Sequence, residues 1–542
     1  MVSIFNDVIG PVMRGPSSSH CAAALRIGRL ARDLMDGQLN EVLVEFDRSG
    51  SLPTTHESQG SDMGLFGGLL GWDADDERLP DSAKFLADAG VHVRIETVDV
   101  GDPHPNTYRL TLRSSQVTHS LIAISTGGGM MEVIELDDIP ISICGGYHET
   151  LLWTTPDAAA RVAADVTHQL PVDELVQLPC RGQMLIQIKS SQFVPQAWID
   201  EQMQRGDIVS ARKLGRVLPV PSRRDMSVPF TSCAEMLQYA AGVQTSLWRL
   251  AVEYESTRGG LSDAEVVQMM VRVVRILRKS IASGLAGTTY DDRVLGFQSG
   301  RFRELMQSER LLDAGALNRI ILYVTALMEV KSSMGVIVAA PTAGACAALP
   351  GAVIGMAEAL GRTEEEMAQA MLAAGMIGVF IAQRWTFAAE VGGCQAEGGS
   401  AASMAAAALV TLAGGSLQQS VAAASLAFQS MLGLICDPIA NRVEAPCLGK
   451  NVMAAANALS CANMALADFD PLIPLDEVID AAKHVAERMP REHRCTSLGG
   501  LAITPTSLAI EQSLAQRKSA ACGQGCGCGV TGQRPIAIQN TG

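Results

Sequence analysis

Hydrophobic and polar positions alternate along the first third of this 542-residue chain in a way that predicts a mixed α/β region. Apolar residues recur at every third or fourth position over residues 25–36, which predicts a helix that ends near Gly37. A second helix is predicted over residues 157–170. Short stretches with the two-residue period of a β-strand lie between turn-forming clusters. The predicted strands cover residues 41–46, 91–98, 107–112, 120–125, 131–136 and 184–188.

The pattern changes after residue 232, where helical spacing dominates and strand signals nearly vanish. The predicted helices cover residues 266–282, 313–328, 364–383, 400–413 and 476–488. A polar segment with Pro219, Pro221 and two arginines separates the two regions. We therefore expect two domains, an N-terminal α/β domain followed by a mostly α-helical domain. The expected boundaries are 1–190 for the α/β domain, 191–228 for a linker, 229–515 for the helical domain and 516–542 for a Cys- and Gly-rich tail.

Composition narrows the class of protein. With 48% hydrophobic and 18% charged residues, the chain is too apolar and too weakly charged to be intrinsically disordered. Aromatic residues make up only 4%, whereas there are 51 Gly, which favours close-packed helices over an aromatic-rich β core. The net charge of −15 argues against nucleic acid or an anionic membrane as a partner, because phosphate binding needs clustered Lys and Arg.

An uncharged stretch over residues 398–435 is long enough to cross a membrane. Its apolarity is modest and it contains Gln418, Gln419 and Gln429, so a pair of buried helices is favoured over a membrane span. Asp7 stands where a signal peptide would have its apolar core, which leads us to expect a cytoplasmic protein. In that reducing compartment the 13 Cys are expected to be buried side chains, metal ligands or reactive thiols rather than disulfides.

Three serines and a histidine, Ser17, Ser18, Ser19 and His20, run directly into the first predicted helix. A serine at a helix N-terminus accepts hydrogen bonds from free N–H groups, and the helix dipole favours an anion there. A substrate carboxylate would suit this position. The alternative is a capped helix that carries a surface histidine.

A second segment holds Pro341, Thr342, Ala343 and Gly344 between two apolar stretches. Small residues allow backbone amides to approach a ligand closely. The segment is therefore a candidate for lining a ligand pocket. A proline-broken connection inside a close-packed core is the alternative.

Two groups of cysteines could hold metal. Cys394, Cys436 and Cys447 each stand near Gly or Pro at a break in the helical pattern, where thiolates could hold an iron–sulfur cluster. They are not in CxxC pairs, so buried structural cysteines remain the alternative. The tail has a Cys-x3-Cys-x-Cys run that could bind zinc, iron or copper, or could belong to a solvated tail: Cys522, Cys526 and Cys528.

The order of these segments resembles the iron–sulfur L-serine dehydratase (L-serine ammonia-lyase) family in its single-chain form. After the Ser-Ser-Ser-His loop come Ala-Pro-Thr-Ala-Gly, then Gly-Gly-Cys-Gln-Ala-Glu around Cys394. Cys-Asp-Pro-Ile-Ala and Val-Glu-Ala-Pro-Cys follow, with Cys436 and Cys447. Further similar segments extend the likeness from residue 4 to residue 503, at residues 125–129, 228–234 and 496–501.

The resemblance implies a [4Fe–4S] cluster held by Cys394, Cys436 and Cys447, with one iron left open. In the family that iron acts as a Lewis acid on the substrate hydroxyl while a base removes the α-proton. The resulting enamine becomes an imine, and water hydrolyses it to pyruvate and ammonium without pyridoxal phosphate. The likeness also implies an amino acid as the small-molecule partner, and a homodimer.

The N-terminal domain is similar to the family's allosteric substrate-binding module, and its loop is implied to face the active site. By this resemblance Ser17, Ser18 and Ser19 bind the substrate carboxylate, and residues 341–344 line the same pocket. His20, with Ser19 and His56, is the implied proton-transfer group.

Some positions depart from the family pattern. Gln59 stands where the family has a second His, and glutamine cannot act as a base near neutral pH. His56, three residues earlier, could replace it, and Cys21 replaces a Thr. Together with Arg14 beside the loop, these departures leave open the same chemistry on threonine, cysteine or 3-hydroxyaspartate. A non-catalytic amino-acid or redox sensor is a further alternative.

Groups near the expected cluster complete the set of candidates. Relatives carry a Cys close to the C-terminus that can cap the open iron, a role open here to Cys522, Cys526 or Cys528. Cys495 is not counted among the ligands. Glu397, Asp437 and Glu444 adjoin the cluster cysteines and could orient them, with solvated helix ends as the alternative.

Overall fold

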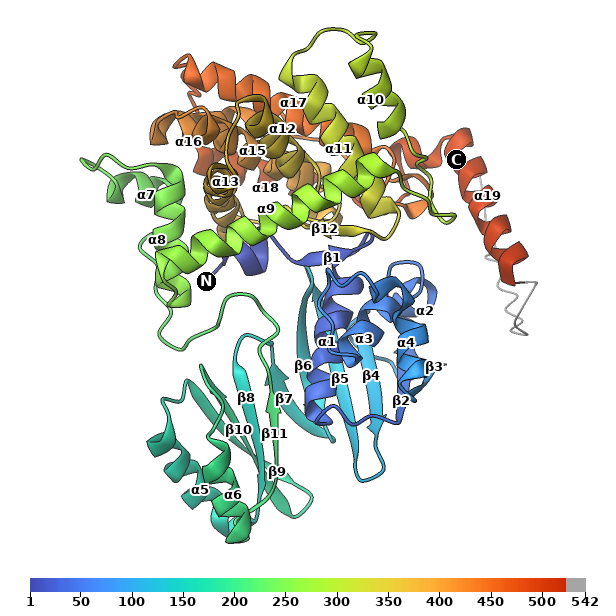
Figure 1. The fold of residues 1–542 in the computed structure, drawn as a ribbon, viewed down its shortest axis with the longest axis vertical. Coiled ribbons are helices and arrows are strands. Elements are labelled where there is room, and N and C mark those ends of the chain that lie inside the picture. The colour runs from blue at the N-terminus through green and yellow to red at the C-terminus, as the bar shows by residue number, and fades with distance from the viewer. Residues whose placement is uncertain (523–542) are drawn as a thin grey trace, which may run out of the picture.

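The computed structural model describes residues 1–522, with side chains as far as residue 517. Figure 1 shows a helical body above two β-sheets that stand next to each other. The expected order of an α/β part followed by a mostly helical part is confirmed. Two of the tail cysteines, Cys526 and Cys528, lie outside the described residues. Cys522 ends α19 (Pro505–Cys522), where only the backbone is described.

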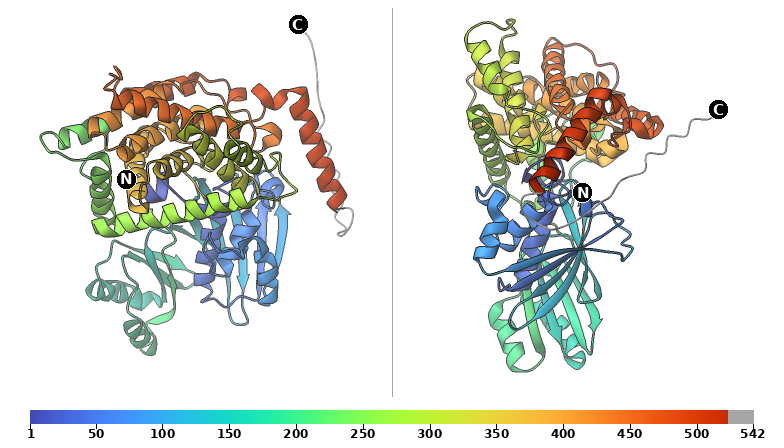
Figure 2. Two further views of the ribbon diagram at one scale, coloured as in Figure 1. Left: turned by 45° about the horizontal axis from the view of Figure 1, so that its top comes forward. Right: turned by 90° about the vertical axis from the view of Figure 1, so that its right-hand side faces the viewer.

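The larger sheet has six strands in the order β3-β2-β4-β5-β6-β7, and only β2 and β3 are parallel. In β2 (Glu41–Asp47), Val42, Val44 and Phe46 are buried and alternate with more exposed residues, as the sequence pattern predicts. Helices α1 (Cys21–Leu34) and α3 (Ser61–Leu69) lie on one face of the sheet, as Figure 2 shows. The other strands are β3 (His92–Val98), β4 (Thr107–Arg113), β5 (Thr118–Gly127), β6 (Met130–Leu136) and β7 (Ile139–Ile143).

The smaller sheet has four strands in the order β11-β8-β10-β9 and belongs to a βαββαβ unit of the ferredoxin-like kind. Its helix α6 and strand β11 fall within residues 191–228, where the sequence indicated a linker. Within the part of the chain that the structure describes, β11 pairs only with β8. As an edge strand it carries polar residues that hide its strand pattern. The elements are β8 (His148–Thr154), α5 (Pro156–Gln169), β9 (Glu174–Cys180), β10 (Gln183–Ser190), α6 (Gln196–Gln204) and β11 (Ile208–Leu214).

The two sheets share a hydrophobic core. Leu151, Trp153 and Leu185 of the smaller sheet pack in one cluster with the buried residues of the six-stranded sheet. On its opposite face the smaller sheet packs against α5 and α6, where Val162 and Ile199 are buried. The α/β part is thus layered, and residues 1–214 do not form a single sheet.

The helical body is built from tightly packed, alanine-rich helices. All of residues 400–410 in α15 are buried, and small side chains allow neighbouring helix axes to approach closely. The uncharged stretch predicted as buried helices forms α15 (Ser400–Leu412) and α16 (Leu417–Gln429). The other helices of at least twelve residues between 247 and 488 are α8 (Leu247–Gly259), α9 (Asp263–Ala286), α11 (Ala316–Ser332), α12 (Ala348–Ala359), α13 (Glu364–Arg384), α17 (Cys447–Leu466) and α18 (Leu475–Arg488).

One helix of the described residues, α13, is long and apolar enough to cross a membrane by length and composition alone. Within its apolar window, 78% of the residues are buried inside the protein. It packs against α8, α9 and α15 in the middle of the helical body. These contacts are those of a core helix.

The first fourteen residues belong to the helical body rather than to the α/β part that follows them. The segment η1 (Ile4–Val8) lies in the helical core, where a Cβ on Gly375 of α13 would meet Ile4 Cγ2 at 2.5 Å. The buried carboxylate of Glu255 accepts hydrogen bonds from Ser3 Oγ at 2.5 Å and from Ile4 N at 2.8 Å. The expected α/β domain of residues 1–190 therefore begins with a segment that anchors it to the helical body.

Candidate active site

Two short strands, β1 (Val12–Arg14) and β12 (Val336–Val338), join the α/β part to the helical body. They are antiparallel, so Val12 faces Val338 and Arg14 faces Val336. The Ser-Ser-Ser-His loop follows β1, and the segment with Thr342 follows β12. The two segments therefore leave this strand pair at opposite ends, and both lie at the boundary between the parts of the molecule.

His20 is buried at the start of α1, and both of its ring nitrogens have partners. Nδ1 lies 2.8 Å from Ser17 Oγ, and Nε2 lies 2.9 Å from Thr55 Oγ1. The Thr55 hydroxyl donates to the Ser51 carbonyl at 2.7 Å, so its oxygen accepts from Nε2–H and Nδ1 accepts from Ser17. Burial, together with the nearby His56, lowers the pKa of His20 to about 4. At neutral pH His20 is an uncharged hydrogen-bonding group.

His56 has the more basic ring. Its Nδ1 lies 2.8 Å from each carboxylate oxygen of Asp62, and this hydrogen bond raises the pKa of His56 above its usual value. The ring lies 5.3 Å from that of Phe46, and 24% of the side chain remains exposed. A histidine oriented by a carboxylate and open to solvent is suited to proton transfer. Gln59, at the position of the family histidine, closes the turn with a 2.9 Å hydrogen bond from its backbone N–H to the Thr55 carbonyl.

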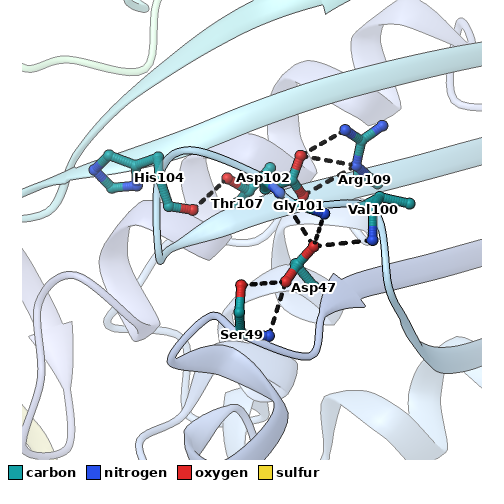
Figure 3. Close-up of polar contacts among 8 residues, drawn as sticks. All are labelled: Asp47, Ser49, Val100, Gly101, Asp102, His104, Thr107 and Arg109. Atoms are coloured by element: carbon teal, nitrogen blue, oxygen red, sulfur yellow. Dashed lines mark hydrogen bonds and ion pairs between the residues drawn. The ribbon is translucent and has the colours of Figure 1, made fainter.

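A network at the end of β2 fixes the start of the loop that carries His56 (Figure 3). The Asp47 carboxylate accepts hydrogen bonds from both the hydroxyl and the backbone N–H of Ser49. It also accepts from three successive N–H groups of the neighbouring loop, those of Val100, Gly101 and Asp102. These hydrogen bonds, led by that of the Ser49 hydroxyl, lower the pKa of Asp47. The charged carboxylate thus ties two loops together at the C-terminal end of β2.

Arg14 does not present a free guanidinium to the Ser-His loop. It is 7% exposed and donates from Nη2 to the Asp76 carbonyl at 2.8 Å and from Nη1 to the Met334 carbonyl at 3.4 Å. It faces a cavity that Glu77 and Lys279 also line. The arginine therefore joins the two parts of the molecule.

The three cysteines singled out by the sequence are all buried, and the chain folds to bring them close together. Cys394 precedes η3 (Gln395–Gly399), Cys436 lies in a loop and Cys447 begins α17. The Cys436 thiol interacts with the thiols of Cys394 and Cys495, and these contacts raise its pKa. Burial raises the pKa of Cys447, to which the nearby Cys394 adds. Sequence reasoning did not count Cys495 in this group.

Two lysines place positive charge beside the thiols. Lys450 donates from Nζ to Asp437 Oδ1 at 2.5 Å and to the Ile435 carbonyl at 2.7 Å, and it lies 3.8 Å from Cys394 Sγ. Although burial opposes it, the charges of Cys394 and Asp437 raise the pKa of Lys450. Lys331 is fully buried and donates to the Val443 carbonyl in the loop before Cys447. Neither lysine carried a sequence signal, because each depends on contacts with distant loops.

Glu397 lies three residues after Cys394. It connects the three buried cysteines to the candidate pocket segment of residues 341–344. Thr342 donates from Oγ1 to Glu397 Oε1 at 2.7 Å, and a Cβ on Gly344 would come within 2.7 Å of the same oxygen. Burial raises the pKa of Glu397 to about 7, against the opposing effect of the Thr342 hydrogen bond. Some solvent access to the side chain remains. Near neutral pH this carboxyl can therefore both give and take a proton.

A loop of the helical body connects the histidine side of the site to the thiol side. Val294 and Leu295 donate backbone hydrogen bonds to Glu444 Oε2 at 2.8 and 2.9 Å, three residues before Cys447. In the same loop, burial raises the pKa of Tyr290, and the charges of Glu57 and Glu444 both add to the effect. Glu57 follows His56 directly, so this loop faces both halves of the candidate site.

Comparison with known proteins identifies the family. A model of the family described as "Serine dehydratase alpha chain" matches residues 242–502. The "Probable L-serine dehydratase, alpha chain" of Bacillus subtilis is 34% identical over 53% of this chain and 95% of that relative. The chain belongs to the L-serine dehydratase family. The "Probable L-serine dehydratase, beta chain" of the same organism is 31% identical over 39% of this chain and 97% of that relative.

L-serine dehydratase relatives also occur as one continuous chain of this extent. "L-serine dehydratase 2" of Escherichia coli is 27% identical over 93% of this chain and 99% of that relative. The chain therefore represents the single-chain form of the L-serine dehydratase family.

The thiols of Cys394, Cys436 and Cys447 fit the iron–sulfur cluster that the L-serine dehydratase family implies. Thiolates are the ligands that iron–sulfur clusters require, and the buried cysteines lie together beside the cationic Lys450. Among the side chains that the structure describes, up to residue 517, no three His, Cys, Asp or Glu form a site for a single metal ion. Each thiolate of a four-iron cluster binds a different iron, so its ligands need not converge on one point.

Proposed function

We propose that this chain is a [4Fe–4S]-dependent L-serine dehydratase that converts L-serine to pyruvate and ammonium. The observation that carries the proposal is the group of buried thiols from Cys394, Cys436 and Cys447 with Glu397 and Lys450 beside it. The cluster, when bound, would supply a Lewis-acidic iron that weakens the carbon–oxygen bond of the substrate. The family membership of the chain supports this chemistry.

The residues of the chain have the tasks of binding the substrate and moving its protons. Residues 17–19 and the N-terminus of α1 would bind the substrate carboxylate, because helix N–H groups and hydroxyls favour an anion. Neutral His20 would hold this loop in place through its bonds to Ser17 and Thr55. Thr342, Ala343 and Gly344 would line the side of the pocket that faces Glu397.

Two groups are suited to proton transfer. Glu397, with its pKa raised to about 7, is half-ionised near neutral pH and would remove the α-proton of the substrate. His56, oriented by Asp62, would exchange protons with solvent at the mouth of the site. We infer that Glu397 acts as the base because it adjoins both Thr342 and the cysteine-bearing segment.

Serine is favoured over a substrate with a second carboxylate. Such a substrate would need a free cation near the Ser-His loop, but Arg14 is buried and donates to two backbone carbonyls. Gln59 in place of the family histidine leaves His56 as the ionisable ring in this turn.

We also propose that the enzyme works as a homodimer, which light scattering of the purified protein tests.

The test of the substrate is an anaerobic assay of 2-oxo acid formation with L-serine, L-threonine, L-cysteine and 3-hydroxyaspartate. We expect L-serine to have by far the highest kcat/KM. A higher value for another amino acid would refute serine as the substrate while leaving the chemistry intact. The absence of 2-oxo acid from every substrate, with the cluster assembled, would favour the sensor alternative.

A further inference from the structure

Cys495 lies beside Cys394 and Cys436, although it is far from both in the sequence. Its backbone N–H donates to the Ala389 carbonyl at 3.3 Å, in the short helix that precedes Cys394. Two residues earlier, the His493 carbonyl accepts from the Cys436 N–H at 2.8 Å. These two hydrogen bonds place Cys495 between the segments of Cys394 and Cys436.

The side chains confirm this placement. Cys495 packs in one small cluster with Cys394, Cys436, Leu434 and Ala389. Cys394 and Cys436 are almost fully buried, whereas Cys495 is partly exposed. It is therefore the thiol on the solvent side of the group, where substrate would arrive.

The loop that carries Cys495 is fixed to the segment after Cys436. Ser497 donates from Oγ to the Pro438 carbonyl at 3.1 Å, and the Leu501 N–H donates to Asp437 Oδ2 at 2.9 Å. Gly500 has a φ of 59°, and a Cβ there would meet the same Asp437 oxygen at 2.7 Å. Asp437 in turn holds Lys450, so one carboxylate links the Cys495 loop to the charge beside the thiols.

We propose that Cys495 is a fourth thiolate ligand of the cluster, occupying the iron that Cys394, Cys436 and Cys447 leave open until substrate enters. This inference rests on the proposed function. Cys495 releases its thiol proton to water when it binds iron and takes one up again when substrate displaces it. Such a ligand protects an open iron from loss in the resting enzyme. The cysteines of the tail are the other possible source of a fourth thiol, and the experiment separates the two.

The experiment compares four full-length proteins reconstituted anaerobically with iron and sulfide. They are the wild type, C495S, the control C461S and a triple variant of the tail, C522S/C526S/C528S. Cys461 is a buried cysteine of α17 outside the thiol group, which makes it a matched control. Iron per chain and circular dichroism are measured first, and C495A replaces C495S if the latter does not fold.

Ferricyanide then accepts one electron from each cluster, and an iron not held by a thiolate leaves as Fe(II). The electron paramagnetic resonance signal of the remaining three-iron cluster reports the rate.

We expect all four proteins to hold about four iron per chain. The three-iron signal should grow roughly tenfold faster in C495S than in the other three proteins. L-serine added to the wild type should give it the sensitivity of C495S.

Equal rates in C495S and the wild type, or sensitivity only in the tail variant, would overturn the inference. Loss of all iron from folded C495S would also overturn it, because Cys495 would then be one of the essential ligands. A wild type without iron would instead refute the proposed function itself.

Discussion

The hydroxyl of Thr342 donates a hydrogen bond of 2.7 Å to Glu397 Oε1, although 55 residues separate them in the sequence. The bond joins the segment after β12 to the segment after Cys394. It also stabilises the charged form of a carboxyl whose burial raises its pKa to about 7. Glu397 is thereby held at the point where it can change its charge near neutral pH.

Replacing Glu397 with Gln should lower kcat by about 10²- to 10⁴-fold, because the variant lacks the proposed base for the α-proton. Iron content should stay at the wild-type level, since Glu397 is not a proposed ligand. The control is E365Q, which alters an exposed carboxyl at the start of α13. Steady-state pyruvate formation measures the effect, and unchanged kcat in E397Q would exclude Glu397 as the base.

The pH dependence of turnover should report the same group. A base must be ionised, so wild-type kcat should rise with pH through about 7, the pKa of Glu397. The Thr342 hydrogen bond lowers that pKa, so T342V should move the rising limb to higher pH while T342S should keep it in place. A rising limb at the same pH in T342V and the wild type would contradict this assignment.

A substitution at Gly344 tests how closely residues 341–344 approach the carboxyl of Glu397. A Cβ at this position would lie 2.7 Å from Glu397 Oε1, so G344A should displace the carboxylate and lower kcat. In contrast, Gly449 on α17 has no heavy atom within 4 Å of a built Cβ, so G449A should retain wild-type kcat. Equal kcat in the two variants would show that the contact does not matter for turnover.

In the α/β part of the site, the Asp62 carboxylate should control the pKa of His56. The hydrogen bond from His56 Nδ1 to Asp62 raises the pKa of the ring, so D62N should lower it. NMR titration of protein with labelled histidine measures the change, and His148 in β8, whose pKa is lowered by burial and by Arg216, serves as the internal reference. No change in the His56 titration would mean that the pair does not form in solution.

A buried carboxyl in the smaller sheet should influence stability. Burial of Glu149 raises its pKa from 4.5 to about 7, so between these values the folded state holds a proton that the unfolded state has lost. Stability should therefore fall as pH rises from about 4.5 to about 7, by roughly 3 kcal/mol in total. E149Q, which has no such proton, should lack this loss. Urea unfolding at several pH values measures it, and parallel curves for both proteins would contradict the prediction.

Much of the fold could be predicted because half-buried strands and amphipathic helices leave a period in the sequence. Strand β2 shows the two-residue period, and its bounds differ from the prediction by one residue. Strand β8 was missed because nearly all of its residues are buried, which removes the alternation. Strand β11 was missed because an edge strand with Ser210 and Arg212 looks like a polar linker.

The candidate site could be predicted only where a residue carries a local motif. Cys394, Cys436 and Cys447 stand in recognisable segments, and the structure places them together. The importance of Glu397 and Cys495 depends on partners far away in the sequence. No local spacing could show that Thr342 would meet Glu397, or that the loop of Cys495 would lie against Cys436.

The central claim is that buried thiols hold a cluster on which turnover depends. The most direct measurement is iron and pyruvate formation in anaerobically reconstituted wild type, C394S, C436S, C447S and the control C461S. We predict about four iron per chain and full activity in the wild type and control, with both lost together in the other three variants. Full lyase activity in iron-free wild type, or in a folded C447S variant without iron, would contradict the account.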